Sequence, residues 1–231
     1  MIKAVFFDFY STLVSFEPPR EELQVTACSE FDIEVDRKAI PLGYWFADDF
    51  MSRENARSPI HKRPLVDEME FWSDYEAIIL NKAGADVSKD LALRIFTRAR
   101  QLDRKLVLFD DVLPIIHILR NRGMVLGVVS NLSRALDGHV KELGLAGYMD
   151  FVLTSSEIGV EKPHPPIFLA ALERAGVTPS EALHVGDQYH SDVLGARGVG
   201  ISPLLLDRDG FWEGIKDCPR IRSLGEIVNY L

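Results

Sequence analysis

The stretch MIKAVFFDFYSTL, residues 1–13, places a charged side chain directly after a short apolar run. The run Ile2–Phe7 is rich in Val, Ile and Phe and ends at Asp8. Short runs of this composition, bounded by polar residues, are typical of buried strands in a parallel sheet. We therefore expect a first strand that presents Asp8 at its carboxyl end.

Similar apolar runs recur in the second half of the chain. The further predicted strands are Val125–Val129, Phe151–Leu153, Leu183–Val185 and Pro203–Leu206. Between them lie helical patterns at Val112–Arg122, Leu136–Leu143 and Pro166–Ala175, the last of which begins with proline and stops at Gly176, as real helices do. The alternation predicts an α/β fold with a doubly wound, Rossmann-like parallel sheet.

The segment from about Glu17 to Leu106 breaks this alternation, because it lacks strand-like runs. Its patterns predict four helices, at Arg20–Phe31, Pro41–Arg57, Asp67–Ala83 and Lys89–Leu102. We interpret residues 17–106 as a helical domain inserted after the first strand, and residues 1–16 with 107–231 as the core domain.

Composition limits the class of partner. The 231 residues carry 26 Lys and Arg against 35 Asp and Glu, a net charge of −9, which disfavours binding to nucleic acid or to an anionic membrane. Cys28 and Cys218 are too far apart for a metal-ligand motif and suggest ordinary thiols in a reducing compartment. We expect a cytoplasmic protein with a small-molecule substrate; the sequence does not define its oligomeric state.

Polar residues follow several of the predicted strands. Asp8 follows the first, Ser130 and Asn131 follow the second, Lys162 lies past the third, and Asp187 follows the fourth. Strand ends of the same polarity share one edge of a parallel sheet, which is where ligands bind. These side chains are therefore expected to converge on one site.

The same residues lie in four motifs that resemble those of the haloacid dehalogenase-like hydrolase superfamily. The matching stretches are Asp8-Phe9-Tyr10-Ser11-Thr12-Leu13, Ser130-Asn131, Lys162-Pro163-His164-Pro165-Pro166-Ile167-Phe168, and Gly186-Asp187 with Asp192 and Gly195-Ala196. They occur in the family's order, and the helical insert occupies the position of the family's cap domain.

The resemblance implies that Asp8 is a covalent nucleophile. It also implies a Mg²⁺ ion held by Asp8, the backbone carbonyl of Tyr10 and Asp187, with Asp192 supporting the ion or pairing with Lys162. Mg²⁺ prefers such oxygen ligands, and cations offset the repulsion between a carboxylate and a phosphate.

Four more residues take implied roles in catalysis and substrate binding. Lys162 would neutralise Asp8 and the transferring group. Ser130 and the Asn131 backbone would donate hydrogen bonds to phosphate oxygens, and Thr12 would hold the loop of the first motif.

Tyr10 departs from the phosphatase pattern, which has a second Asp at this position as general acid and base. A phenol, with a pKa near ~10, is a poor substitute at neutral pH. Tyr at this position is typical of 2-haloacid dehalogenases. The chain has no obvious match, near the start of the helical insert, to their halide-binding arginine, and Arg20 is the nearest candidate. Asp187 and Asp192, in contrast, indicate Mg²⁺ and phosphate. The leading prediction is a Mg²⁺-dependent phosphatase of a small metabolite; a dehalogenase and a weakly active phosphate-binding regulator remain open.

Overall fold

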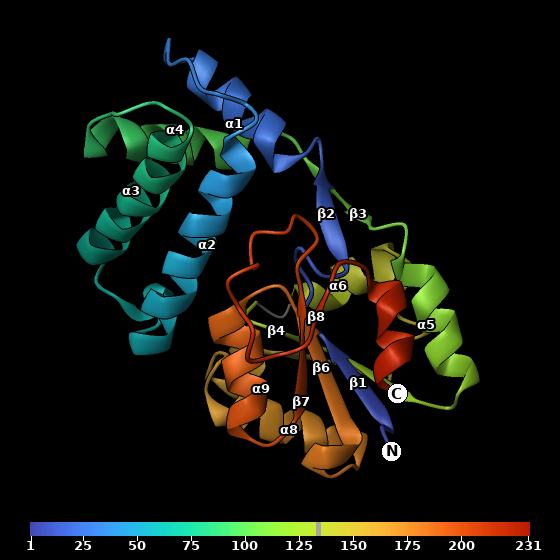
Figure 1. Ribbon diagram of the computed structural model, residues 1–231. Helices are drawn as coiled ribbons and strands as arrows, with labels where there is room; N and C mark the ends of the chain where they lie inside the picture. Colours follow the sequence, from blue (N-terminus) through green and yellow to red (C-terminus); the bar gives the residue numbers. More distant parts are fainter. Residues whose placement is uncertain (133–134) are drawn as a thin grey trace. The chain divides into compact units, whose positions relative to one another are not determined.

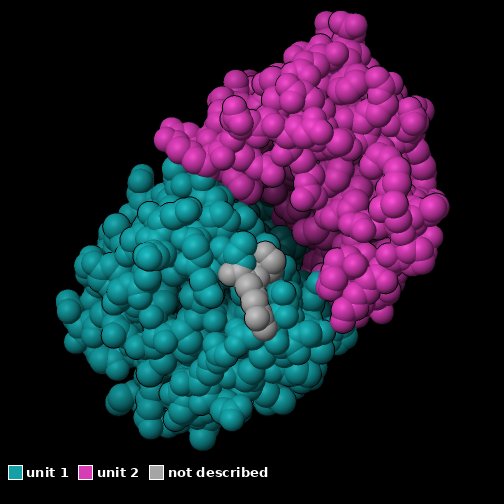
Figure 2. Space-filling model, turned by 180° about the vertical axis from the view of Figure 1, so that it is seen from behind, with its two compact units in different colours: residues 1–15, 106–231 teal, residues 16–105 magenta. Residues whose placement is uncertain are grey.

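The computed structural model describes residues 1–132 and 135–231. The chain forms two compact units, which Figure 2 distinguishes by colour. We call Met1–Ser15 with Leu106–Leu231 the core unit and Phe16–Lys105 the helical unit. That the helical unit acts as a cap stays a prediction.

A parallel sheet forms the centre of the core unit (Figure 1). Among the described residues it has six strands in the order β5-β4-β1-β6-β7-β8. Their bounds are Phe151–Thr154 for β5, Val125–Ser130 for β4, Ala4–Phe7 for β1, Ala182–Gly186 for β6, Ser202–Leu206 for β7 and Arg220–Ile221 for β8. The predicted parallel α/β fold is confirmed, with β1 inside the sheet between β4 and β6.

The two faces of β1 explain why its sequence is apolar throughout. Val5 and Phe7 belong to one hydrophobic cluster together with α5, Val112–Asn121, whereas Ala4 and Phe6 belong to a second cluster with α8, Pro165–Ala175. All four side chains are fully buried. Because successive strand residues point to opposite faces, a strand covered on both sides needs apolar residues at every position.

Helices cover both faces of the sheet, with α5 on one side and α8 and α9 on the other (Figure 1). The remaining elements of the core unit are α6 at Leu136–Glu142, α7 at Ser155–Ile158, α9 at Gly195–Gly198, a π-helical turn at Tyr189–Leu194, and 3-10 helices at Pro179–Glu181 and Leu224–Tyr230.

The helical unit is built from four long helices, as the sequence predicts. They are α1 at Arg20–Ser29, α2 at Ile40–Arg57, α3 at Leu65–Lys82 and α4 at Lys89–Gln101, with a 3-10 turn at Ile60–Lys62. The sequence analysis missed the short pair β2, Val14–Glu17, and β3, Lys105–Leu108, as well as β8. Strands this short carry too little periodicity to be recognised. Within the described ranges, no helix is long and apolar enough to cross a membrane.

A buried polar network holds the helical unit together. Arg20 donates to Asp48 at 2.7 Å, and the Tyr75 hydroxyl donates to the other Asp48 oxygen at 2.6 Å. The Arg20 guanidinium also lies over the Tyr44 ring, 4.2 Å from its centroid. Arg20 is thus an internal structural residue of this unit, linking α1 to α2.

Glu76 is the carboxyl group of this network that lacks a cationic partner in the contacts described. It accepts a hydrogen bond from the Gln24 amide, whose oxygen accepts from the Tyr44 hydroxyl at 2.9 Å. The Glu76 residue is 1% exposed, and burial, opposed by the Gln24 hydrogen bond, raises its pKa to about 7.

We predict that Glu76 makes the protein less stable as pH rises from about 4.5 to about 7. The folded state favours the protonated carboxyl, so that stability present at low pH is lost on ionisation, by up to roughly 3 kcal/mol. Glu76→Gln stays neutral and should remove this loss. In urea unfolding, the free energy of unfolding of the variant should therefore rise relative to that of the wild type as the pH increases.

The control is Glu70→Gln on the same helix, where the side chain is 64% exposed. Its stability should run parallel to that of the wild type across this pH range. Parallel curves for Glu76→Gln as well would contradict the assignment of the pH effect to Glu76.

Candidate active site

The residues predicted to converge do lie together at the carboxyl edge of the sheet. Asp8 follows β1, and its backbone N–H donates to the carbonyl of Val185 in β6 at 2.9 Å. Ser130 ends β4, and Asp187 follows β6 directly. The order of β4, β1 and β6 as neighbours therefore brings these polar residues side by side.

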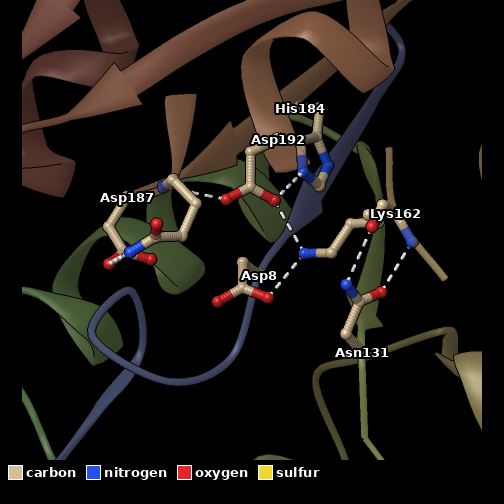
Figure 3. Close-up of polar contacts among 7 residues, drawn as sticks. Asp8, Asn131, Lys162, His184, Asp187 and Asp192 are labelled. Atoms are coloured by element: carbon tan, nitrogen blue, oxygen red, sulfur yellow. Dashed lines mark hydrogen bonds and ion pairs between the residues drawn. The ribbon is translucent and has the colours of Figure 1, made fainter. Parts of the chain in front are cut away.

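Lys162 is the centre of the polar contacts (Figure 3). Its ammonium group donates to Asp8 Oδ1 and to Asp192 Oδ1, at 2.6 Å each. The residue is only 2% exposed, so this charge lies inside the protein. Lys162, from the third motif, thereby joins Asp8 of the first motif to Asp192 of the fourth.

Asn131 fixes the backbone of Lys162 by two hydrogen bonds (Figure 3). The Asn131 amide nitrogen donates to the Lys162 carbonyl at 3.0 Å, and the Lys162 N–H donates to the Asn131 amide oxygen at 2.7 Å. The sequence analysis assigned the Asn131 backbone to the substrate but did not foresee this use of its side chain.

Asp192 is held as an ionised acceptor. Its Oδ1 accepts from Lys162 and lies 2.9 Å from His184 Nε2, while its Oδ2 accepts from the Gln188 backbone N–H at 3.0 Å. Burial alone would raise the pKa of Asp192, but the Lys162 charge and the His184 contact outweigh it and hold that pKa well below its usual range. Asp192 thus pairs with Lys162, and its support of a metal ion stays a prediction.

His184 is completely buried in β6 and has Asp192 as its partner. Gly186, two residues on, leaves room for the same carboxyl group, because a Cβ there would lie 2.2 Å from the Asp192 carboxyl carbon. β6, which ends at the first residue of the fourth motif, thus supplies both a partner and the space for the Asp192 carboxyl group.

The charges of Asp8 and Lys162 depend on each other. Burial raises the pKa of Asp8; the neighbouring Lys162 ammonium lowers it and the Asp192 charge raises it further, leaving it above the usual value. Burial would lower the pKa of Lys162, but Asp192 and Asp8 outweigh this effect and raise it. Lys162 therefore stays an ammonium, one positive charge between two carboxylates.

Three carboxylates could hold a divalent cation. One oxygen from each of Asp8, Asp187 and Asp192 lies within 4.8 Å of the other two. Such oxygen donors fit Mg²⁺, which is usually bound through one or two carboxylates. Asp192 accepts hydrogen bonds through both of its oxygens, from Lys162 and from the Gln188 N–H, whereas Asp8 accepts from Lys162 through Oδ1 and Asp187 accepts from the Gln188 side chain through Oδ2. Asp8 and Asp187 are also the two carboxylates that the resemblance implies as direct ligands.

The other residues of the first motif contribute to the loop after β1. Thr12 is fully buried, and its hydroxyl has no hydrogen-bond partner among the described residues. Ser130, from the second motif, is 3% exposed. Tyr10 is half-buried, pairs its backbone with Val14 and packs edge-on to the Phe9 ring. The burial of Thr12 fits the structural role expected of it, and the roles of Ser130 and Tyr10 toward a substrate stay predictions.

Two residues near the C-terminus also contact the site loops, and the sequence analysis missed both. The Trp212 indole N–H donates to the Asp187 carbonyl at 3.0 Å, and Arg208 donates to the Thr12 carbonyl at 3.0 Å. Arg208 is itself fixed by two hydrogen bonds of 2.9 Å to Asp111. No motif signals these contacts, because they join segments far apart in sequence.

The fold places one aspartate, Asp8, directly after the first strand of a parallel sheet, beside a buried lysine. Residues 2–200 match the haloacid dehalogenase-like hydrolase family. The chain belongs to that family.

Relatives in this family carry different names. Haloacid dehalogenase-like hydrolase domain-containing protein 3 is 48% identical over 87 residues in Mus musculus, covering 38% of this chain and 35% of that protein; the Homo sapiens form is 30% identical over 217 residues, covering 89% and 82%. Glyceraldehyde 3-phosphate phosphatase of Methanopyrus kandleri is 31% identical over 213 residues, covering 90% and 85%. The 2-haloacid dehalogenase structure from Pseudomonas syringae pv. Tomato is 27% identical, with a TM-score of 0.58 and coverage of 99% and 97%.

We predict that Lys162→Met destabilises the fold by about 3–5 kcal/mol, because it leaves the buried Asp8 and Asp192 carboxylates without their cation. Urea unfolding measures this loss. The matched control is Lys3→Met, which breaks an exposed pair with Glu181 and should cost less than about 1 kcal/mol. Equal losses in the two variants would show that Lys162 does not compensate buried charge.

Proposed function

We propose that this protein is a Mg²⁺-dependent phosphohydrolase that acts on a small phosphorylated molecule through Asp8. The observation that carries the proposal is the position of the Lys162 ammonium, 2.6 Å from both Asp8 and Asp192, in a cluster with a third carboxylate, Asp187. A lone carboxylate repels a phosphate, so nucleophilic attack by Asp8 needs nearby positive charge. The Methanopyrus kandleri relative, named glyceraldehyde 3-phosphate phosphatase, supports phosphate ester hydrolysis as the type of reaction.

The proposal assigns a task to each group of the site. A carboxylate oxygen of Asp8 attacks the phosphorus atom, and Lys162 orients that carboxylate and offsets charge on the transferring group. Asp187 and Asp8 would hold Mg²⁺, which when bound neutralises phosphate charge. Ser130 and the Asn131 backbone would donate hydrogen bonds to phosphate oxygens.

A 2-haloacid dehalogenase is the second candidate, favoured by Tyr10 and by the similarity to the Pseudomonas syringae enzyme. In that reaction Asp8 attacks carbon and halide leaves without a proton. Against it, Arg20, the candidate for a halide-binding arginine, is engaged with Asp48 and Tyr44 inside the helical unit. Halide release from 2-chloropropionate without metal would favour this candidate over the phosphohydrolase.

The direct test is phosphate release from an aryl phosphate with and without Mg²⁺. We expect release by the wild type only with Mg²⁺, and none by Asp8→Asn, because an amide cannot act as this nucleophile. Asp90→Asn, at an exposed position of the helical unit, should behave as the wild type. Phosphate release that survives Asp8→Asn would contradict the assigned nucleophile.

We also predict that Trp212→Phe weakens Mg²⁺ binding about tenfold. The indole N–H fixes the backbone of Asp187, and groups that orient a metal ligand typically contribute 10–100-fold in affinity. Isothermal titration calorimetry with Mg²⁺ alone measures the change, and Trp45→Phe in the helical unit is the control. If the two variants bind Mg²⁺ equally well, Trp212 does not position Asp187 for a cation.

A further inference from the structure

The groups that surround Asp8 determine which leaving groups it can displace. An alkoxide is a strong base, so an alkyl phosphate is cleaved efficiently only when a side chain gives a proton to the departing oxygen. Lys162 directs its ammonium protons to two carboxylates, Asp8 and Asp192. It is committed to holding the nucleophile and is poorly placed to protonate a leaving group.

The neighbouring carboxylates are not proton donors either. Asp192 takes part in contacts with Lys162, His184 and the Gln188 N–H through both of its oxygens, which is the pattern of an ionised acceptor. Asp187 belongs to the cation-holding cluster with Asp8, and metal ligands of this kind are ionised. Each carboxylate near Asp8 is thus assigned to a task that requires its negative charge.

Tyr10 occupies the position nearest in sequence from which another acid could act. A phenol is a far weaker acid than a carboxyl group. Its ring packs edge-on to Phe9 and against the hydrophobic cluster of the core unit. Tyr10 is therefore a packing residue of the loop after β1. It takes the place of the carboxylic acid that would protonate an alkoxide leaving group.

We propose that the site is specialised for phosphoryl donors whose leaving group needs no proton, namely acyl, enol and aryl phosphates. This inference rests on the proposed phosphohydrolase function and narrows its substrate class. Carboxylate, enolate and phenolate leaving groups are weaker bases than an alkoxide, so they can depart as anions. The residues described around Asp8 supply what such a reaction needs: a nucleophile, a fixed ammonium group and oxygen ligands for a cation.

The first step balances without an acid. An Asp8 oxygen forms a bond to phosphorus, the bond between phosphorus and the leaving oxygen breaks, and its electron pair departs with the leaving group as an anion. The product is an aspartyl phosphate on Asp8. In the loose transition states usual for phosphoryl transfer, charge builds up on the leaving oxygen, so the rate depends steeply on leaving-group basicity when no acid is present.

In the second step water attacks the phosphorus of the aspartyl phosphate. The bond from phosphorus to the Asp8 oxygen breaks, its electrons return to the carboxylate, and the proton of water passes to the product phosphate or to solvent. A general base would speed this attack, and the three described groups clustered with Asp8, on Lys162, Asp187 and Asp192, already have the tasks given above. With activated donors the phosphorylated protein should therefore accumulate, because its formation outpaces its hydrolysis.

A leaving-group series tests the proposal on the full-length wild type with Mg²⁺. The donors are acetyl phosphate, aryl phosphates whose phenols differ in acidity, and one alkyl phosphate. We expect kcat/KM to fall by roughly 10²–10⁴ from the most acidic phenol to the alkyl phosphate, the range that a general acid usually contributes. Equal rates for aryl and alkyl phosphates would overturn the proposal and leave the phosphohydrolase function standing.

Two substitutions at one position sharpen the test. Tyr10→Asp should raise alkyl phosphate cleavage by up to roughly 10²–10⁴ and flatten the dependence on the leaving group. Tyr10→Phe should keep the steep wild-type dependence, because the phenol takes no part in proton transfer. A large loss of alkyl phosphate cleavage in Tyr10→Phe would show that the Tyr10 hydroxyl is the acid, and would overturn the proposal.

Rapid mixing with an acidic aryl phosphate gives a second readout. We expect a burst of phenol equal to the amount of protein, together with a phosphoryl group on the intact chain by mass spectrometry. Asp8→Asn should show neither. Phenol release without a burst or phosphorylated chain would overturn the slow second step, and a wild type that cleaves none of the donors would overturn the phosphohydrolase function itself.

Discussion

Burying the ammonium group of Lys162 sets the constraint on which the rest of the site depends. A buried charge costs several kcal/mol unless it is paired and hydrogen-bonded, and Asp8 and Asp192 meet that condition at 2.6 Å each. Asp192 in turn needs His184 and the Gln188 N–H to remain an ionised partner. Lys162, itself held by Asp192, thereby keeps the candidate nucleophile Asp8 in one orientation.

The parallel sheet makes this arrangement possible. Placing β1 between β4 and β6 brings the ends of three strands together, and each end presents one polar group to the site. The segment after β7 then holds the site loops from outside the sheet, through Trp212 to the Asp187 carbonyl and Arg208 to the Thr12 carbonyl. A stable scaffold thus leaves the chemistry to a few side chains, and Tyr10, which packs in the loop after β1, is the residue that departs from the phosphatase pattern.

Much of the fold could be predicted because its signals are local. Within the run Ile2–Phe7, residues Ala4–Phe7 alternate between two buried faces, and Asp8 follows them, so the strand and the position of Asp8 at the sheet edge both follow from one stretch. The site contacts of Trp212, Arg208 and the Asn131 side chain could not be predicted, because each joins distant segments without a periodic pattern. The short strands β2, β3 and β8 were missed for a similar reason, since pairing rather than sequence defines them.

The most direct test of the central claim is a crystal structure of the protein grown with Mg²⁺ and beryllofluoride, a stable mimic of a phosphoryl group. We expect a beryllofluoride group on the Asp8 carboxylate, with the Lys162 ammonium beside it and Mg²⁺ shared by Asp8 and Asp187. An unmodified Asp8 with Mg²⁺ bound away from this cluster would contradict the claim that these residues form one phosphoryl-transfer site.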